Sequence, residues 1–420
     1  MRAFISKSEI KGKVTSPSSK SYTIRGLMCA SLAKGTSEIV SPLSSDDTEA
    51  AIDALAKIGV RFSQGTNSLQ VTSGDFHTPS APLYCRESAA TLRFMTAICS
   101  LVTGHCELYA APSLAVRPIM PLIQALKQLG IDCHYRKDKG CIVVKGGALK
   151  SGVAELPGNI SSQFVSALLL ISPFAEEEMI VRLTTPLESK PYVLMTMECL
   201  QEFGITVTFS ENLREFVTPR QPYNPIRYTV EGDWSSASYL LASGALCGEI
   251  EVSNLNSRSL QGDRIMVDFL KDMGASVTTD KGSVTVRRSR LKAIKADLTD
   301  CIDLLPTLAV LAVAAKGTSV FTGIERARLK ESNRVVAVRE GLAKMGIETE
   351  EERNQLTITG AIPEGAMIDS RGDHRIAMAF SLLGTLVGGT IIEGAECVVK
   401  TYPEFWDTLK SIGGEVKLDE

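Results

Sequence analysis

The sequence predicts an α/β protein assembled from six copies of one helix-and-strand unit. A helix ending of the form Leu-x-x-apolar-Gly recurs six times, and a strand-like alternation of apolar and polar residues follows it. The length of 420 residues is long for one hydrophobic core and therefore favours two domains. A composition of 44% hydrophobic and 22% charged residues is typical of an ordinary globular protein.

The repeated helix ending is written, for example, LAKIGVRF or LQEFGITV, with the Leu and the apolar residue three positions later facing a core. A glycine stops the helix because it adopts the left-handed conformation freely. Strands such as GCIVVKGG and NQLTITG follow. One such ending is common, so the regular spacing carries the prediction; an elongated solenoid is the weaker alternative, because its period is usually about 20 to 50 residues. The six glycines, spaced 67 to 74 residues apart, are Gly59, Gly130, Gly204, Gly274, Gly346 and Gly413.

Charge and cysteine content exclude several classes of protein. The formal net charge of −3 gives no general attraction to nucleic acid or to an anionic membrane. No apolar run reaches membrane-spanning length and the start, MRAFISKSEIKGK, lacks the apolar core of a signal peptide, so a cytoplasmic protein is expected. Ten cysteines without a CxxC pair and four scattered histidines predict neither a disulfide framework nor structural zinc.

Several predicted helices open with unusual polar side chains. In SPSSKSYTIRG, Ser18 and Ser19 can cap a helix that ends before Gly35. Lys20 and Arg25 lie near its start, where the helix dipole favours anions instead. Any one such cluster is more often an ordinary cap, but together they predict a site for a small, multiply charged anion. The other clusters are RESAATLR at 86–93, VRP at 116–118, SSQF at 161–164, SKPY at 189–192 and DHR at 373–375.

A second polar group lies in the latter half of the chain. Asp300 and Asp303 come just before a strongly apolar helix, and the segment RLKESNR supplies Lys330, Glu331 and Arg334. Lys330 and Arg334 are four residues apart and are expected to share a helix face. Charge runs are usually solvated, salt-bridged surface helices. The functional alternative is a carboxylate held among cations and suited to proton transfer.

With these motifs, the chain resembles the 5-enolpyruvylshikimate-3-phosphate synthase family over essentially its full length. The resemblance implies a two-domain inverse α/β barrel in which each domain contains three βαβαββ units. It places the boundaries near Gly12 and Thr229, giving one domain of residues 13–228 and a second of residues 1–12 and 229–420. The matching stretches, in the family's order, are SKSYTIRG, RPI, SSQFVSALL, SKPY, EGDWSSASYLLA, LKESNR, GDHRIAMA and KTYPEFW.

The resemblance also implies an activity in the shikimate pathway, which leads to chorismate and the aromatic amino acids. The enolpyruvyl group of phosphoenolpyruvate moves to the 5-hydroxyl of shikimate 3-phosphate, and phosphate is released. No metal, organic cofactor, nucleic acid or membrane is implied, and a monomer is expected. Asp303 is the implied base at the hydroxyl and Glu331 the proton donor at C3, with Lys20 assisting and His374 near the reacting methylene.

The implied binding residues form two groups. Those for shikimate 3-phosphate are Lys20, Ser21, Arg25, Ser161, Ser162, Gln163, Ser189, Tyr192, Asp303 and Lys330. Those for phosphoenolpyruvate are Lys20, Arg93, Arg117, Gln163, Arg334, Arg375 and Lys400. Two phosphates and two carboxylates in one site need about that many cations, preferably Arg where bidentate contact is possible.

The chain departs from the family pattern before Arg93. The family usually has Asn-Ala/Ser-Gly-Thr where this chain has Glu87, Ser88, Ala89 and Ala90. Ala89 adds a methyl group where glycine lets the backbone approach phosphoenolpyruvate, and Glu87 adds a negative charge unless Arg86 or Arg93 compensates it. Weaker binding of phosphoenolpyruvate and reduced sensitivity to glyphosate, which occupies that space, are therefore expected. A smaller departure is Arg326, where the family often has Asn or Glu.

Three alternatives remain open from the sequence. A UDP-N-acetylglucosamine enolpyruvyl transferase resembles this fold, but it usually carries Cys where this chain has Pro112. An RNA 3'-terminal phosphate cyclase is disfavoured by the acidic charge balance. A non-catalytic repeat scaffold would leave the clustered Lys, Arg, Asp and Glu side chains unexplained.

Overall fold

A computed structural model describes residues 1–419 of the chain. Contacts between residues divide it into two compact units: the N-terminal unit, Ser18–Val230, and the C-terminal unit, which joins Met1–Pro17 to the chain from Glu231 onward. Each unit has its own hydrophobic core. The domain boundaries near Gly12 and Thr229 are a separate proposal from the sequence, and we do not equate them with the two units defined here by contacts.

Each unit contains three four-stranded sheets with one connectivity, so the predicted six-unit α/β architecture is confirmed. In every sheet one edge strand runs parallel to the strand beside it, and the other two pairs of neighbouring strands run antiparallel. The sheets of the N-terminal unit are β14 (Arg227–Thr229), β3 (Thr36–Val40), β5 (Ser68–Thr72), β4 (Arg61–Gly65); β6 (Leu83–Tyr84), β7 (Gly104–Tyr109), β9 (Cys141–Gly146), β8 (Asp132–Arg136); and β10 (Gly152–Leu156), β11 (Glu178–Leu183), β13 (Glu215–Pro219), β12 (Thr208–Phe209).

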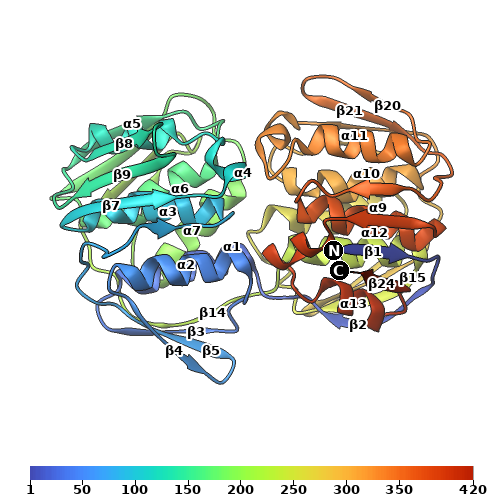
Figure 1. Ribbon diagram of the computed structural model, residues 1–420, viewed down its shortest axis with the longest axis horizontal. Helices are drawn as coiled ribbons and strands as arrows, with labels where there is room; N and C mark the ends of the chain where they lie inside the picture. The colour runs from blue at the N-terminus through green and yellow to red at the C-terminus, as the bar shows by residue number, and fades with distance from the viewer. Residues whose placement is uncertain (420) are drawn as a thin grey trace. The chain divides into compact units, whose positions relative to one another are not determined.

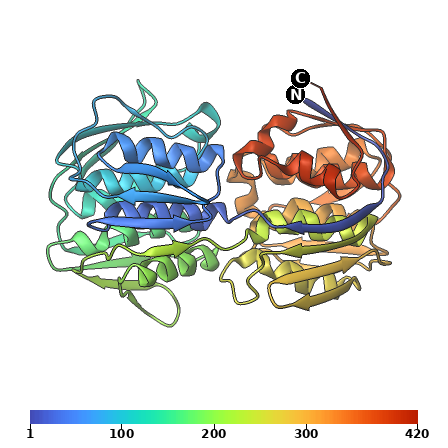
Figure 2. The ribbon, with the colours of Figure 1, turned by 90° about the horizontal axis from the view of Figure 1, so that it is seen from below.

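The C-terminal unit repeats this arrangement. Its sheets are β16 (Ser276–Asp280), β17 (Ser283–Arg287), β15 (Gly248–Ser253), β2 (Ile10–Thr15); β18 (Lys295–Asp297), β19 (Thr318–Thr322), β21 (Gln355–Thr359), β20 (Thr349–Glu351); and β22 (Met367–Asp369), β23 (Thr390–Glu393), β1 (Arg2–Ile5), β24 (Val416–Asp419). Strands distant in sequence complete a sheet in each unit: β14, in green, lies parallel to β3, in blue (Figure 1), and the dark blue β2 lies parallel to β15 (Figure 2).

Three inner helices lie in the core of each unit. Their residues are almost all buried, because they are apolar or small on every face. In the C-terminal unit, for example, α8, α10 and α12 pack against one another. The inner helices are α1 (Lys20–Leu32), α3 (Ala89–Ile98) and α6 (Ser162–Ile171) in the N-terminal unit, and α8 (Trp234–Cys247), α10 (Leu305–Val313) and α12 (His374–Val387) in the C-terminal unit.

The six outer helices end as the repeated motif predicts. Each of the six predicted glycines lies two residues beyond the helix end with φ between +78° and +113°, a conformation that favours glycine. A strand of the corresponding sheet follows each glycine. The outer helices are α2 (Asp46–Lys57), α5 (Met120–Gln128), α7 (Lys190–Glu202), α9 (Met266–Asp272), α11 (Arg334–Lys344) and α13 (Phe405–Ser411).

Shorter helical segments connect these elements. They are α4 (Pro112–Ala115) and the 3-10 helices η1 (Cys99–Leu101), η2 (Ser172–Phe174), η3 (Gly262–Ile265), η4 (Ile302–Leu304), η5 (Glu325–Leu329) and η6 (Ala395–Lys400). Within residues 1–419, no helix is both long and apolar enough to cross a bilayer.

Two details of the sequence prediction are wrong. Lys330 and Arg334 do not share a helix face, because α11 begins at Arg334, after Asn333, whose side-chain oxygen accepts a hydrogen bond from the Val336 N–H (3.3 Å). Lys330 precedes this cap in an extended conformation. Arg117 likewise does not open a helix, since α5 begins at Met120.

Candidate active site

In the N-terminal unit, predicted site residues gather where inner helices begin. Helix α1 is capped by Ser19, whose Oγ accepts a hydrogen bond from the Tyr22 N–H (3.4 Å), and α6 by Ser161, whose Oγ accepts one from the Gln163 N–H (3.3 Å). Lys20 Nζ lies 2.8 Å from Asp47 Oδ2 on helix α2. The sequence therefore places cations and serine caps together at these helix openings, as predicted.

Arg25 is a buried cation with neutral partners. Its side chain donates from Nε to Thr196 Oγ1 (2.8 Å), from Nη1 to the Ser21 carbonyl (2.9 Å) and from Nη2 to the Tyr192 carbonyl (2.9 Å). The guanidinium also lies over the rings of Phe94 and Tyr192, at 5.5 and 5.9 Å from their centroids. With 2% of the residue exposed, burial lowers the pKa of Arg25. Its charge is thus compensated by dipoles rather than by a carboxylate among the described residues.

Arg93, on helix α3, connects two further segments of the site. Its Nη1 donates to Gln163 Oε1 (2.5 Å) and Ser161 Oγ (3.3 Å), and its Nη2 donates to the Pro118 carbonyl (3.2 Å). Arg117, next to Pro118, is buried with 8% exposed, and Ser162 is buried at the first position of α6. The opening of α6 and the segment before α5 are therefore held together through one guanidinium.

Ser189 caps helix α7 in a strained conformation. It has φ 54° and ψ 45°, the left-handed region that non-glycine residues rarely adopt, and it is buried. Such strain costs on the order of 1 to 3 kcal/mol and is found most often at functional sites. The Ser189 carbonyl accepts a hydrogen bond from the Tyr192 N–H (3.1 Å), and Tyr192 in turn covers Arg25. Ser189 is thus connected to the opening of α1.

In the C-terminal unit, the predicted residues form an ionic network around Arg334. Its Nη1 donates to Asp303 Oδ1 (2.6 Å), its Nε to Asp373 Oδ2 (2.8 Å) and its Nη2 to Glu331 Oε2. The residue is only 1% exposed. Burial alone would lower the pKa of Arg334, but Asp373, Glu331 and Asp303 raise it above the usual value. Three carboxylates, two of them from distant segments, are therefore fixed around one buried cation.

Asp303 is the carboxylate with the most cationic neighbours in this network. In addition to Arg334, Lys330 Nζ lies 3.3 Å from its Oδ1 and Arg375 Nη2 lies 3.4 Å from its Oδ2. Burial alone would raise the pKa of Asp303, but Arg375, Lys330 and Arg334 hold it well below the usual value. Burial lowers the pKa of Lys330. Asp303 is therefore ionised at neutral pH.

Helix α12 begins within the same network. Asp373 caps it by accepting a hydrogen bond from the Arg375 N–H (3.0 Å), and the Arg375 Nη1 donates to the Tyr239 hydroxyl (3.3 Å). His374 is fully buried, with its Nδ1 3.9 Å from Asp373 Oδ1. Lys400 is buried at the end of η6, which packs against α12. The predicted residues of the latter half thus lie on or beside the starts of α10, α11 and α12.

Sequence reasoning missed two carboxylates of this unit. The DHR cluster contains Asp373 but does not indicate that it is one of the three carboxylate partners of Arg334. Asp263, in η3, is buried and accepts a short hydrogen bond from Ser235 Oγ. Burial, with Asp303 nearby, raises the pKa of Asp263 to about 7. The polar segment QGD carries no sequence signal that distinguishes Asp263 from an exposed carboxylate.

The structure shows the surroundings of the residues that depart from the family pattern. Ala89 is the first residue of α3, and Glu87 accepts a short hydrogen bond from Ser113 Oγ. Arg86 pairs with three carboxylates of α2, namely Asp46 (2.8 Å), Glu49 (3.2 Å) and Asp53 (2.6 Å). Since these carboxylates already compensate Arg86, it contributes little positive charge toward Glu87. Arg326 is buried and donates from Nη2 to the Thr299 carbonyl (2.6 Å).

Comparisons with known proteins identify the family of the chain. The family model described as EPSP synthase (3-phosphoshikimate 1-carboxyvinyltransferase) matches residues 5–409. A 3-phosphoshikimate 1-carboxyvinyltransferase of Dehalococcoides mccartyi is 50% identical over 100% of both chains, and one of Methanosarcina mazei is 44% identical over 99% of both. A solved EPSP synthase of Acinetobacter baumannii superposes with a TM-score of 0.83 at 26% identity, covering 99% of this chain and 100% of that one. The chain belongs to the EPSP synthase (3-phosphoshikimate 1-carboxyvinyltransferase) family.

Proposed function

We propose that the chain transfers the enolpyruvyl group of phosphoenolpyruvate to the 5-hydroxyl of shikimate 3-phosphate, in the pathway to chorismate and the aromatic amino acids. The hydroxyl oxygen forms a bond to C2 and loses its proton, while C3 gains a proton. The tetrahedral intermediate then loses a proton from C3 as its C2–O bond to phosphate breaks. Full-length similarity to relatives that bear the name of this reaction carries the proposal.

Shikimate 3-phosphate is assigned mainly to the N-terminal unit. A buried guanidinium that has dipoles as partners gains most from an anionic ligand, and Arg25 is such a group. Serine hydroxyls and free N–H groups at helix starts suit a phosphate. The assigned residues are Lys20, Ser21, Arg25, Ser161, Ser162, Gln163, Ser189 and Tyr192, with Asp303 and Lys330 from the C-terminal unit at the sugar-like hydroxyls.

Phosphoenolpyruvate is assigned to the cations Lys20, Arg93, Arg117, Arg334, Arg375 and Lys400, together with Gln163. Arg334 already donates to three carboxylates, so contact with the ligand requires one of these hydrogen bonds to be exchanged. Arg375 has a longer contact with Asp303 (3.4 Å) and is the easier cation to redirect. The two arginines are therefore expected to differ in role, with Arg375 as the direct ligand and Arg334 chiefly orienting the carboxylates.

Proton transfer is assigned to Asp303 and Glu331, assisted by Lys20 and His374. Asp303 is ionised but weakly basic while three cations surround it. If Arg375 turns toward bound phosphoenolpyruvate, the Asp303 carboxylate loses part of its positive surroundings and becomes a stronger base. Substrate binding would thus activate the base at the moment when the hydroxyl is in place.

The alternative reaction, on UDP-N-acetylglucosamine, receives no support from the relatives found, which are named for shikimate 3-phosphate. The test is phosphate release from phosphoenolpyruvate with each acceptor in turn. Release with shikimate 3-phosphate and none with UDP-N-acetylglucosamine is expected. Release with the nucleotide sugar alone, or with neither acceptor, would overturn the proposal.

We further infer that the enzyme is a cytoplasmic monomer and needs no metal or organic cofactor. Dialysis against a chelator should therefore leave phosphate release unchanged, and light scattering should give the mass of one 45.3 kDa chain. We also keep the division into residues 13–228 and residues 1–12 with 229–420 as the proposed domain boundary.

A further inference from the structure

A hollow lies in the C-terminal unit where the inner helices α10 and α12 end, at the opposite ends from their starts beside the candidate site. Residues from the last turns of α10 and α12 line it, together with the connections before β18 and β22. Its volume is about 660 Å³, within the range typical of pockets for small molecules. Its apolar lining includes Leu291, Val313, Ile362, Pro363 and Val387.

The rim of this hollow is strongly basic. Lys7, Arg290, Lys292 and Lys316 line it, and Arg288 lines an adjoining hollow that shares Arg290 with it. No Asp or Glu lines either hollow. Within residues 1–419, none of the five cations has a carboxylate oxygen within 4.0 Å. We name the two together the basic hollow.

Helix dipoles do not account for this charge. Three helix C-termini carry roughly half a negative charge each, which is less than the five positive charges of the basic hollow. The last turns of α8, α10 and α12 contain no basic residue, so the cations come from the adjoining connections. The excess of positive charge therefore needs another explanation.

The N-terminal unit provides an internal comparison. A hollow at the same ends of its inner helices has a volume of about 360 Å³ and is lined by Leu32, Leu101 and Phe174. Its charged residues are one Lys34 and one Asp75, so it has no net charge. Because the N-terminal unit has the same architecture with a balanced number of cations and carboxylates at these helix ends, the fold does not require the five cations of the C-terminal unit.

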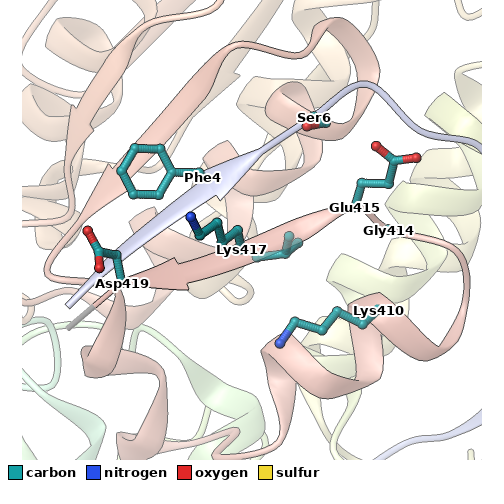
Figure 3. A pocket seen from close by; sticks show the side chains of 8 residues that line it. Phe4, Ser6, Lys410, Gly414, Glu415, Lys417 and Asp419 are labelled. Atoms are coloured by element: carbon teal, nitrogen blue, oxygen red, sulfur yellow. The ribbon is translucent and has the colours of Figure 1, made fainter.

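Another hollow of the C-terminal unit shows the same balance. It lies at β1, β24 and α13, where Lys410 and Lys417 are matched by Glu415 and Asp419 (Figure 3). Neither this hollow nor the one in the N-terminal unit has the excess of positive charge that the basic hollow has.

We propose that the basic hollow binds a small amphipathic anion, an aromatic carboxylate, with its apolar body against Leu291 and Ile362 and its carboxylate between Lys292 and Lys316. Ile362 is 91% exposed, and covering it stabilises such a complex. A two-fold contact between two copies through this face is disfavoured because like charges would face each other. The 14 residues of α12 place the ligand about 20 Å from His374.

The test is calorimetric titration of the full-length protein with 2-naphthoate, and with 2-naphthylmethanol as its neutral counterpart. We expect 2-naphthoate to bind and 2-naphthylmethanol not to bind, and the affinity for 2-naphthoate should fall as salt is added. The double variant Lys292→Glu, Lys316→Glu should lose at least about tenfold in affinity, because two charge-assisted contacts become repulsive. Lys410→Glu, a charge reversal at the balanced hollow of Figure 3, should bind as the unmodified chain does.

Several outcomes would overturn the proposal. These are equal binding of the neutral alcohol, undiminished binding by the double variant, or displacement of 2-naphthoate by shikimate 3-phosphate. Binding of a hexaglutamate peptide without binding of 2-naphthoate would also overturn it, in favour of a macromolecular partner. Phosphate release by the double variant should equal that of the unmodified chain, so loss of this binding and failure of the proposed reaction are distinguishable.

Discussion

In each unit one arginine among the candidate site residues is almost completely buried, Arg25 with 2% and Arg334 with 1% exposed, and the two arginines have opposite surroundings. Arg25 donates to a hydroxyl and two carbonyls and lies over two rings, and burial lowers its pKa. Arg334 donates to three carboxylates, which raise its pKa despite burial. From this comparison we propose a division of labour, in which Arg25 of the N-terminal unit binds an anionic ligand and Arg334 of the C-terminal unit holds carboxylates in place.

The largest effect is expected from removing the proposed base of the C-terminal unit. Asp303→Asn keeps the size of the side chain but removes its ability to accept a proton. We expect kcat for phosphate release to fall by about 10²- to 10⁴-fold, the usual contribution of a general base. This decrease in kcat is measured by following phosphate release with both substrates at saturating concentration.

The matched control is Asp268→Asn, an exposed carboxylate on α9 of the same unit. It should leave kcat unchanged. If Asp303→Asn retained more than about a tenth of the activity, proton acceptance would belong to another residue, and the division of labour would lose its main support.

The second prediction compares the two arginines by their effect on stability. Arg334→Met removes the cation shared by Asp373, Asp303 and Glu331, and the free energy of unfolding should fall by about 3 to 5 kcal/mol, chiefly because the buried Asp373 carboxylate loses its guanidinium partner. Arg25→Met removes a charge whose partners are neutral, so the loss should stay below about 2 kcal/mol. Urea denaturation followed by circular dichroism measures both.

The affinity for shikimate 3-phosphate should distinguish the two variants in the opposite order, with the larger loss in Arg25→Met. Arg25→Met is expected to weaken binding of shikimate 3-phosphate at least about tenfold, since a charge-assisted contact is lost. Equal losses of stability in the two variants would show that neutral dipoles and carboxylates compensate a buried guanidinium equally well, contrary to the comparison.

The fold was predictable because its main signal is local. A glycine two residues beyond each outer helix must adopt positive φ, and this requirement leaves the same mark six times. The start of α1 is local in the same way, since Ser19 caps the helix within one turn. Local backbone chemistry can be read from neighbouring residues without knowledge of the tertiary structure.

The ionic network could not be predicted in the same way. Asp373 lies 39 residues from Arg334, and Asp303 lies 31 residues from it, so their contacts depend on how the repeated units pack. The error over Lys330 has a similar origin: a spacing of four residues indicates a shared face only if the helix is continuous, and the cap at Asn333 interrupts it. The sequence identified Asp303, Glu331 and Arg334 as candidates, but neither the part of Asp373 in the network nor which of these residues bind one another.

The third prediction concerns the buried carboxyl of Asp263 and the pH dependence of stability. Its pKa of about 7 in the folded chain lies above the ordinary 3.8, so between these pH values the folded chain binds one proton more than the unfolded chain. Asp263 therefore lowers the free energy of unfolding as the pH rises from about 4 to 7. Asp263→Asn, which can still accept from Ser235, removes this cost and should stabilise the chain by about 2 kcal/mol more at pH 8 than at pH 5. A stabilisation independent of pH would contradict the raised pKa.

The smallest effect is expected at Ala89, in the N-terminal unit, where the change is one methyl group. Ala89 is the first residue of α3 and is 8% exposed, so its Cβ occupies space close to the helix opening where phosphoenolpyruvate is proposed to bind. Ala89→Gly should lower KM for phosphoenolpyruvate and increase inhibition by glyphosate, each by about tenfold, the usual effect of one methyl group in a close-fitting site. Ala90→Gly, at the next position, is the matched control and should change the two constants less. An Ala89→Gly enzyme with unchanged constants would show that the charge of Glu87, rather than the space taken by Ala89, distinguishes this helix opening, and Glu87→Gln would then produce the larger change because Arg86 is already paired with α2.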